Sequence, residues 1–139
     1  MAIKIQGNIV LNHDGSSYSS TNIAVGYGAL VGNTTGVHNT ALGYQSLYTS
    51  KSGVDNTAVG YQSLYNNTSG YYNTGIGSGS LYFNTYGHDN TALGYVSLAC
   101  NTTGAYNTAV GGSDNIGYGA LYSNTTGVNN TAVGNGALG

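Results

Sequence analysis

The amino-acid sequence predicts an all-β protein, a parallel β-solenoid in which each coil takes 17 residues. Three observations predict this fold: a repeat of constant length, short apolar runs between glycines and asparagines, and the lack of a helical pattern. A unit of 17 residues is too short for the helical-repeat families, which need about 33 to 47 residues. No apolar stripe with helical spacing persists, and each glycine inside a helix would cost about 1 kcal/mol.

The repeat becomes visible when the chain is aligned on the asparagine that opens each unit. Five successive spacings are 17 residues long, the next is 23 because residues 112–117 are inserted, and the seventh unit has ten residues. The consensus reads N-T-A-[VLI]-G-Y-x-[SA]-L-Y-x-N-T-[TS]-G-x-x. The repeat region therefore spans 22–139, and its units open at Asn22, Asn39, Asn56, Asn73, Asn90, Asn107 and Asn130.

Each part of the unit has an expected structure. Positions 2 to 4 and positions 8 to 10 are predicted to be strands, joined by a turn at the glycine and tyrosine of positions 5 and 6. The polar N-T-T-G loop at positions 12 to 15 leads to the next coil, and its glycine is expected to adopt the positive φ of a tight corner. Coils stack at about 4.8 Å, so seven coils rise about 30 Å.

Stacking places the same position of successive units side by side. The opening asparagines are expected to form an amide ladder, and the tyrosines of positions 6 and 10 to stack in two columns, because such ladders stabilise stacked strands. The columns are Tyr27, Tyr44 and Tyr61, and Tyr48, Tyr65 and Tyr82. Position 9 is leucine in every unit and is expected to fill the lumen, through Leu30, Leu47, Leu64, Leu81, Leu98, Leu121 and Leu138.

The assignment of inner and outer faces leads to a prediction about assembly. Adjacent strand residues face opposite sides. If the large residues of positions 4 and 9 face inward, the small residues of positions 3, 5 and 8 face outward. A row of small outer residues favours close approach of another chain, and closure around a symmetry axis is the usual outcome. We therefore expect a homotrimer; the alternative is a monomeric solenoid with solvated alanines.

Composition argues against several functional classes. Glycine, asparagine, threonine and tyrosine make up 72 of the 139 residues, and the formal net charge is −2. With two lysines and no arginine, nucleic-acid binding is not expected, because neutralising phosphates needs clustered cations. No apolar run approaches the roughly 20 residues of a membrane span. The opening residues lack the apolar core of a signal peptide, so synthesis without export is expected.

Neither an enzyme site nor a cofactor or metal site is predicted. Two His-Asp pairs, at 13–14 and 88–89, come without a G-x-S-x-G nucleophile elbow, and His88 and Asp89 occupy variable corner positions. No H-x-H motif is present, and Cys100, the one cysteine, cannot form an intrachain disulfide. We expect a protein without catalytic residues.

The stretches NTALGYQSLY (39–48) and NTAVGYQSLY (56–65) resemble two related groups of proteins. One is the head repeat of trimeric autotransporter adhesins, a left-handed parallel β-roll with the motif A-[IV]-G-x-x-[AS]. The other comprises bacteriophage tail-fibre and virion appendage proteins with NTAxGYxALxxNTTG repeats. The resemblance covers 22–139, and it departs at Gly75, at Ser78 and at the insertion. The matching positions include Ala41, Leu42 and Gly43, and Ala58, Val59 and Gly60.

The resemblance implies a non-enzymatic structural protein: a trimeric phage fibre, spike or decoration subunit that projects from the virion and contacts the host surface. The lack of a signal peptide and of an anchor favours the phage group, with assembly in the host cytoplasm. Residues 1–21 lie outside the repeat and alternate like a strand, so we expect an attachment or capping segment that joins another virion protein. The alternative is a bacterial surface adhesin or a self-assembling extracellular filament subunit.

Two further functions remain open. In a receptor-binding adhesin, corner tyrosines would contact host glycans by stacking and hydrogen bonding. The candidates are Tyr71, Tyr72, Tyr86 and Tyr106. An ice-binding solenoid would present a flat threonine array, but the threonines lie mostly in corners and at position 2, without a T-x-T motif on one strand. Ice binding therefore ranks last.

Overall fold

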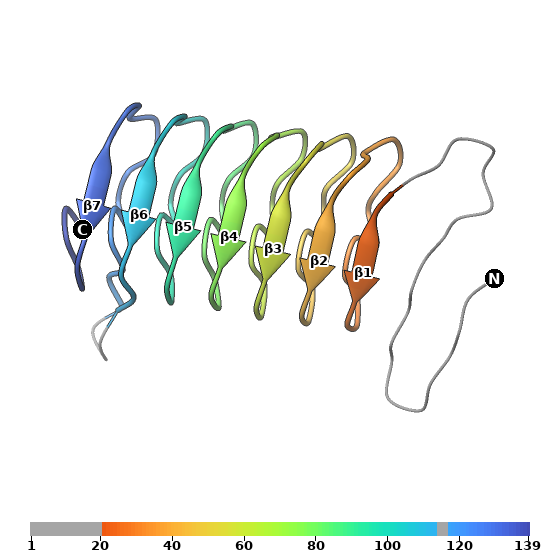
Figure 1. Cartoon of the computed structure of the whole chain (residues 1–139), viewed down its shortest axis with the longest axis horizontal. Coiled ribbons are helices and arrows are strands. Elements are labelled where there is room, and N and C mark those ends of the chain that lie inside the picture. The colour runs from red at the N-terminus through yellow and green to blue at the C-terminus, as the bar shows by residue number, and fades with distance from the viewer. Residues whose placement is uncertain (1–20, 114–116) are drawn as a thin grey trace.

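A computed structural model describes residues 21–113 and 117–139 of the chain (Figure 1). These ranges contain seven three-residue strands and no helix, so no helix here could span a bilayer. The strands are β1 (Ile23–Val25), β2 (Thr40–Leu42), β3 (Thr57–Val59), β4 (Thr74–Ile76), β5 (Thr91–Leu93), β6 (Thr108–Val110) and β7 (Thr131–Val133). The predicted all-β solenoid of 17-residue coils, with a strand at positions 2 to 4, is confirmed.

The seven strands form one parallel sheet in chain order, and Figure 1 shows them side by side along the long axis. Each strand pairs in register with the next, so that Ala41 lies opposite Ala58 and Leu42 opposite Val59. The insertion of the sixth unit does not shift this register, because Ala109 still pairs with Ala132. Each strand position therefore forms a continuous column along the solenoid.

The strand expected at positions 8 to 10 is wrong, because this part of the coil is a series of turns. Leu64 and Gln62 have φ values of 51° and 53°, in the left-handed region, and the other leucines of position 9 do the same. Left-handed backbone costs a residue other than glycine about 1–2 kcal/mol. Two gains offset that cost: the leucine side chain points into the lumen, and the Leu64 N–H donates to the Ser80 carbonyl of the next coil at 2.9 Å.

The role expected for the glycine of position 15 is also wrong. Positive φ occurs at position 5, where Gly60 has a φ of 130°, and not at Gly70 of position 15. A Cβ on Gly70 would collide with the Asn67 side-chain oxygen and with the carbonyl oxygen of Gly87. Glycine is needed at this corner because an asparagine side chain and the next coil pass directly over it.

The predicted orientation of the strand residues is reversed at positions 3 and 4. Ala58 is 0% exposed and packs in the core, whereas Leu42 is 46% exposed. The lumen is narrow and already holds the leucine of position 9 and the asparagines of positions 1 and 12, so only a methyl group fits from position 3. The large aliphatic residues of position 4 therefore face outward, and the small residues of positions 3 and 8 do not form an outer face.

The leucine column fills the lumen as expected. Leu47, Leu64, Leu81 and Leu98 are completely buried, and Leu138 in the last coil is 68% exposed because no coil covers it here. The attachment or capping segment expected at 1–21 lies outside the described residues, apart from Thr21. Of the insertion at 112–117, the structure describes only 112, 113 and 117.

Candidate functional site

The buried asparagines of position 1 form the predicted amide ladder and are fully occupied by it. Asn73 Nδ2 donates to Asn56 Oδ1 at 3.2 Å and to the Gly87 carbonyl at 2.8 Å, and the Asn73 backbone N–H donates to the same Asn56 Oδ1 at 3.0 Å. The same contacts recur at Asn90. Because these bonds satisfy the amides of Asn73 and Asn90, this column of buried polar side chains is used to hold successive coils together.

A second amide ladder runs along position 12, which the sequence reasoning treated only as part of a polar loop. Asn84 Nδ2 donates to Asn67 Oδ1 at 2.8 Å, and Asn101 Nδ2 donates to Asn84 Oδ1 at 2.8 Å. The ladder is interrupted at Ser50, and Asn33 Oδ1 and Ser50 Oγ are buried without a hydrogen-bond partner. The conserved asparagine at position 12 of the consensus was the signal that could have predicted this ladder.

The first exposed feature is the outer sheet face, formed by positions 2 and 4 of the seven strands. Position 4 presents a column of partly or largely exposed aliphatic side chains along the whole described solenoid. This aliphatic column consists of Val25, Leu42, Val59, Ile76, Leu93, Val110 and Val133. A contiguous exposed apolar surface of this kind is a candidate interaction surface.

Beside the aliphatic column, position 2 contributes a column of threonines from Thr40 to Thr131, with neighbours in register. Within the described residues the threonine hydroxyls of this column form no hydrogen bond, unlike Thr85 and Thr102 in the corners, whose hydroxyls donate to backbone carbonyls. None of the chain's charged residues occupies position 2 or 4. The outer sheet face is thus uncharged, apolar and lined by free hydroxyls.

The second exposed feature is a groove between the two tyrosine columns that the repeat predicts. The Tyr44 and Tyr61 rings are stacked with centroids 5.3 Å apart and planes 6° from parallel. Tyr48 and Tyr65 are stacked at 5.0 Å and 5°. Parallel rings at these distances are offset-stacked, a favourable arrangement for aromatic pairs.

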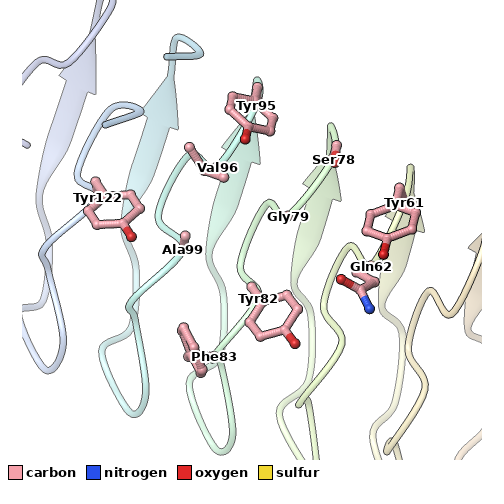
Figure 2. Close-up of a pocket in the computed structure, with 10 residues that line it drawn as sticks. All are labelled: Tyr61, Gln62, Ser78, Gly79, Tyr82, Phe83, Tyr95, Val96, Ala99 and Tyr122. Carbon is pink, nitrogen blue, oxygen red and sulfur yellow. The ribbon is translucent and has the colours of Figure 1, made fainter. Parts of the chain in front are cut away.

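Both tyrosine columns are interrupted at adjacent coils, and a cavity of about 220 Å³ lies there. Ser78 stands where position 6 has tyrosine, Gly79 stands where the two units before it have glutamine, and Ala99 replaces the tyrosine of position 10. Figure 2 shows three parallel rows of lining residues, with Ser78 between Tyr61 and Tyr95 in one of them. The cavity lies where two tyrosines of the consensus are replaced by shorter side chains and where the variable position 7 is glycine.

The cavity lining carries unused polar groups and no charge. Gln62 Nε2 donates to Gln45 Oε1 at 2.9 Å in the preceding coil. Gly79 has no side chain to continue this ladder, so the Gln62 oxygen is left on the cavity side, as Figure 2 shows. Ser78 adds a hydroxyl without a hydrogen-bond partner in the described part of the chain, and Tyr61 and Tyr95 add two phenol side chains to the lining.

Two tyrosines of this groove have raised pKa values. The pKa of Tyr122 is raised by the negative charge of the Cys100 thiolate, by a hydrogen bond to that sulfur, and by burial. The pKa of Tyr65 is raised by loss of hydration and then by its stacked neighbours Tyr82 and Tyr48. Both phenols therefore stay neutral at physiological pH and can act as hydrogen-bond donors.

The tyrosines expected to contact a glycan are brought together only in part. Tyr71 stacks on His88 at 4.7 Å and contacts Tyr72 edge to face at 5.4 Å. His88 in turn contacts Tyr106 edge to face at 5.2 Å, so these four rings form one corner cluster. Tyr86 is exposed and joins no ring contact in the described ranges.

The His-Asp pairs belong to corners. His88 Nδ1 lies 3.0 Å from its neighbour Asp89, and His38 Nδ1 lies 3.4 Å from Asp55 of the next coil, a pair that sequence reasoning missed. The pair at 13–14 lies outside the described residues. No group of three or more potential metal-binding side chains occurs in the part that the structure describes.

Comparison with protein-family models, with curated proteins and with solved structures finds no match for this chain. The outer sheet face, the tyrosine groove and the corner cluster are therefore the features from which a function can be inferred.

Proposed function

We propose that the chain is a non-enzymatic structural subunit of a virion fibre, in which three copies close around an axis with their outer sheet faces turned inward. The observation that carries the proposal is the aliphatic column on a surface without charge. Water contact with a continuous row of valine, leucine and isoleucine side chains is unfavourable by about 25 cal/mol per Å². A partner of the same shape and composition removes that contact.

The size of this face limits the area that each chain can bury through it in an assembly. Seven strands at about 4.8 Å and three residues per strand make a face of about 30 Å by about 10 Å, or about 300 Å². Stable pairwise interfaces use about 800 Å² on each partner. One face is smaller than this on each partner, so an assembly also needs contact area from the flanking side chains; three such faces would enclose one shared apolar interior.

The interface first expected from the sequence used the alanines of position 3, and the structure rules it out because Ala58 and Ala92 are completely buried within one chain. The proposal keeps the trimer and replaces the contact surface. From β2 onward each unit contributes a threonine and a branched aliphatic residue to this face, so symmetry-related columns can pack coil against coil.

The virion assignment is supported by the resemblance of the repeats to phage fibre repeats. In this proposal residues 1–21 attach the fibre to another virion protein, and the exposed rings contact the host surface. The non-enzymatic role is supported by the use of the buried asparagines as hydrogen-bond ladders and by the corner location of the described histidines.

The proposal is tested by charging the outer sheet face. Leu42→Lys with Leu93→Lys places two cations per chain in the shared interior, where unpaired charges are strongly unfavourable. The wild-type chain should have the mass of a trimer by light scattering, and the double variant should be a folded monomer by circular dichroism. The control is Val31→Lys with Val128→Lys, at two exposed valines away from this face, and it should remain trimeric. A monomeric wild type, or a trimeric Leu42→Lys/Leu93→Lys variant, would contradict the proposal.

Ice binding is a second candidate, and the structure strengthens the observation in its favour. The threonines of position 2 and the aliphatic residues of position 4 both face outward in register. They form a flat grid of hydroxyl and methyl groups spaced about 4.8 Å between strands and about 6.7 Å along each strand. The test is a measurement of thermal hysteresis. Hysteresis in the wild-type protein that is lost in the Thr57→Lys/Thr91→Lys double variant would establish ice binding.

A further inference from the structure

We propose that the cavity in the tyrosine groove binds a neutral saccharide, with one sugar ring at the level of Ser78 between the rings of Tyr61 and Tyr95. The cavity is formed by a single chain, so this site does not depend on how the chains assemble. It lies in the columns of positions 6, 7 and 10, and it is distinct from the corner cluster around His88.

The spacing of the column fits one inserted ring. Successive tyrosines of position 6 stack at 5.3–5.6 Å, one coil apart. Tyr61 and Tyr95 are two coils apart, which separates them by about 10 Å at about 4.8 Å per coil. A ring placed at the Ser78 level therefore meets an aromatic face at the normal stacking distance on each side. The apolar C–H face of a sugar ring is a suitable partner for the negative face of a tyrosine.

The polar groups around this gap favour a sugar over an aromatic compound. The Gln62 oxygen has no donor from the coil that follows, and the Ser78 hydroxyl has no partner in the described residues. Burying these groups under an aromatic hydrocarbon would leave them unpaired, at a cost in binding. Sugar hydroxyls can donate to the amide oxygen and exchange hydrogen bonds with Ser78, Tyr61 and Tyr95.

The absence of charge in the lining selects a neutral ligand. The lining contains tyrosine, phenylalanine, glutamine, serine, glycine, valine and alanine side chains only. An acidic sugar or a phosphate would receive no cation here. The volume of about 220 Å³ is below the roughly 300–1,000 Å³ of sites for drug-sized ligands, so one ring of a longer chain is the fitting unit.

The sequence departures that create the cavity occur together on one face. Ser78, Gly79 and Ala99 belong to two adjacent units; Ser78 and Ala99 each replace a tyrosine of the consensus, and Gly79 occupies the variable position 7. Ala99 removes a ring from the second column between Tyr82 and Tyr122, which gives a neighbouring sugar ring a second place to lie (Figure 2). The cavity is therefore extended along the surface, in the direction that an oligosaccharide needs.

The experiment restores the consensus. Wild-type protein is titrated with a panel of neutral disaccharides built from hexoses, deoxyhexoses and N-acetylhexosamines, and with p-cresol as an aromatic comparison, while tyrosine resonances are followed by NMR. We expect at least one disaccharide to bind and to shift resonances of Tyr61 and Tyr95. Ser78→Tyr fills the gap with the ring of the other units, so it should weaken binding by at least about tenfold, the equivalent of one good stacking contact.

The matched control is Val31→Tyr, which also restores a consensus tyrosine in these columns but lies outside the cavity. It should bind like the wild type, and both variants should melt at or above the wild-type temperature, which shows that lost binding is not lost folding. The proposal is overturned if no disaccharide binds, if p-cresol alone binds, or if Ser78→Tyr and Val31→Tyr bind equally well.

Discussion

Two adjacent columns of the same strands differ in burial: position 3 faces the lumen and position 4 faces outward. The alanines of position 3 are buried, and Ala41, Ala58 and Ala92 have no exposed surface at all. The valines, leucines and isoleucine of position 4 are larger and more apolar, yet they face outward, and Val133 is 71% exposed. The two columns lie one residue apart along every strand.

The difference shows that the shape of the lumen decides orientation in a coil this small. Four other columns already point inward: the asparagines of positions 1 and 12, the small residues of position 8 and the leucines of position 9. The remaining space admits a methyl group. Exposing the larger residue costs hydrophobic free energy in a single chain, and an assembly that covers the outer sheet face recovers it.

The largest effect is expected when the same charge is placed in each column. Ala58→Arg buries an unpaired cation in the lumen, which should cost more than about 4 kcal/mol and abolish the folded state at ordinary temperature. Val59→Arg points to solvent and should leave the stability of a single chain within about 0.5 kcal/mol. Urea unfolding of the two monomeric variants measures the contrast, and equal losses would show that the assignment of the two faces is wrong.

A smaller effect is expected in the leucine column. Leu64→Ala in a middle coil should lower the free energy of unfolding by about 2–5 kcal/mol, because a cavity is left in a closely packed lumen. Leu138→Ala, the same change at the exposed end of that column, should cost less than about 0.5 kcal/mol. Thermal or urea unfolding of both variants compares them; a costly Leu138→Ala change would place that residue in a covered environment.

A gain in stability of about 1 kcal/mol is expected from completing the second amide ladder. Ser50→Asn supplies a donor to the unpaired Asn33 Oδ1 and an acceptor for Asn67 Nδ2, in the geometry that Asn84 already adopts. Ser50→Ala is the control, and it should be nearly neutral because the Ser50 hydroxyl makes no hydrogen bond. A destabilising Ser50→Asn change would mean that this coil lacks the room that the other coils provide.

The smallest effect is a pH dependence at the edge of the tyrosine groove. The pKa of Tyr122 is raised, chiefly by the Cys100 thiolate, above the ordinary value of about 10. A raised pKa means that the folded state favours the neutral phenol. Its contribution to stability is therefore complete below about pH 10 and is lost as pH rises through the raised pKa. Unfolding measured across this range should show a decline that is smaller in Cys100→Ser, and identical pH profiles would exclude the Cys100 effect.

Much of the fold could be predicted from the sequence, because each position of the coil recurs in successive units and its preferred residue type can be read from all of them. The strand at positions 2 to 4, the Asn56 ladder, the Leu64 column and the stacked tyrosines all follow from rules that act on one position and its copies in neighbouring coils. These predictions required no knowledge of the coil's cross-section.

What could not be predicted depends on that cross-section. Strand alternation requires positions 3 and 4 to face opposite sides but does not say which one faces inward. The left-handed backbone conformation of Leu64 could not be predicted from residue propensities, because leucine rarely adopts it. In the sequence, Ser78 is only a departure from the consensus. The cavity could not be predicted without knowing that Ala99 lies on the same face of the solenoid.

The central claim is that the aliphatic column is outside each coil and is covered only by assembly, and thiol labelling tests it most directly. In a Cys100→Ser background, the labelling rates of Ala58→Cys and Val59→Cys variants are compared over a range of protein concentrations. We predict that the thiol at position 58 is protected at every concentration. The thiol at position 59 should react quickly in dilute protein and slowly where light scattering finds trimers. A position 59 thiol that reacts equally fast in the monomer and the trimer would contradict the claim, as would a position 58 thiol that reacts faster than the one at position 59.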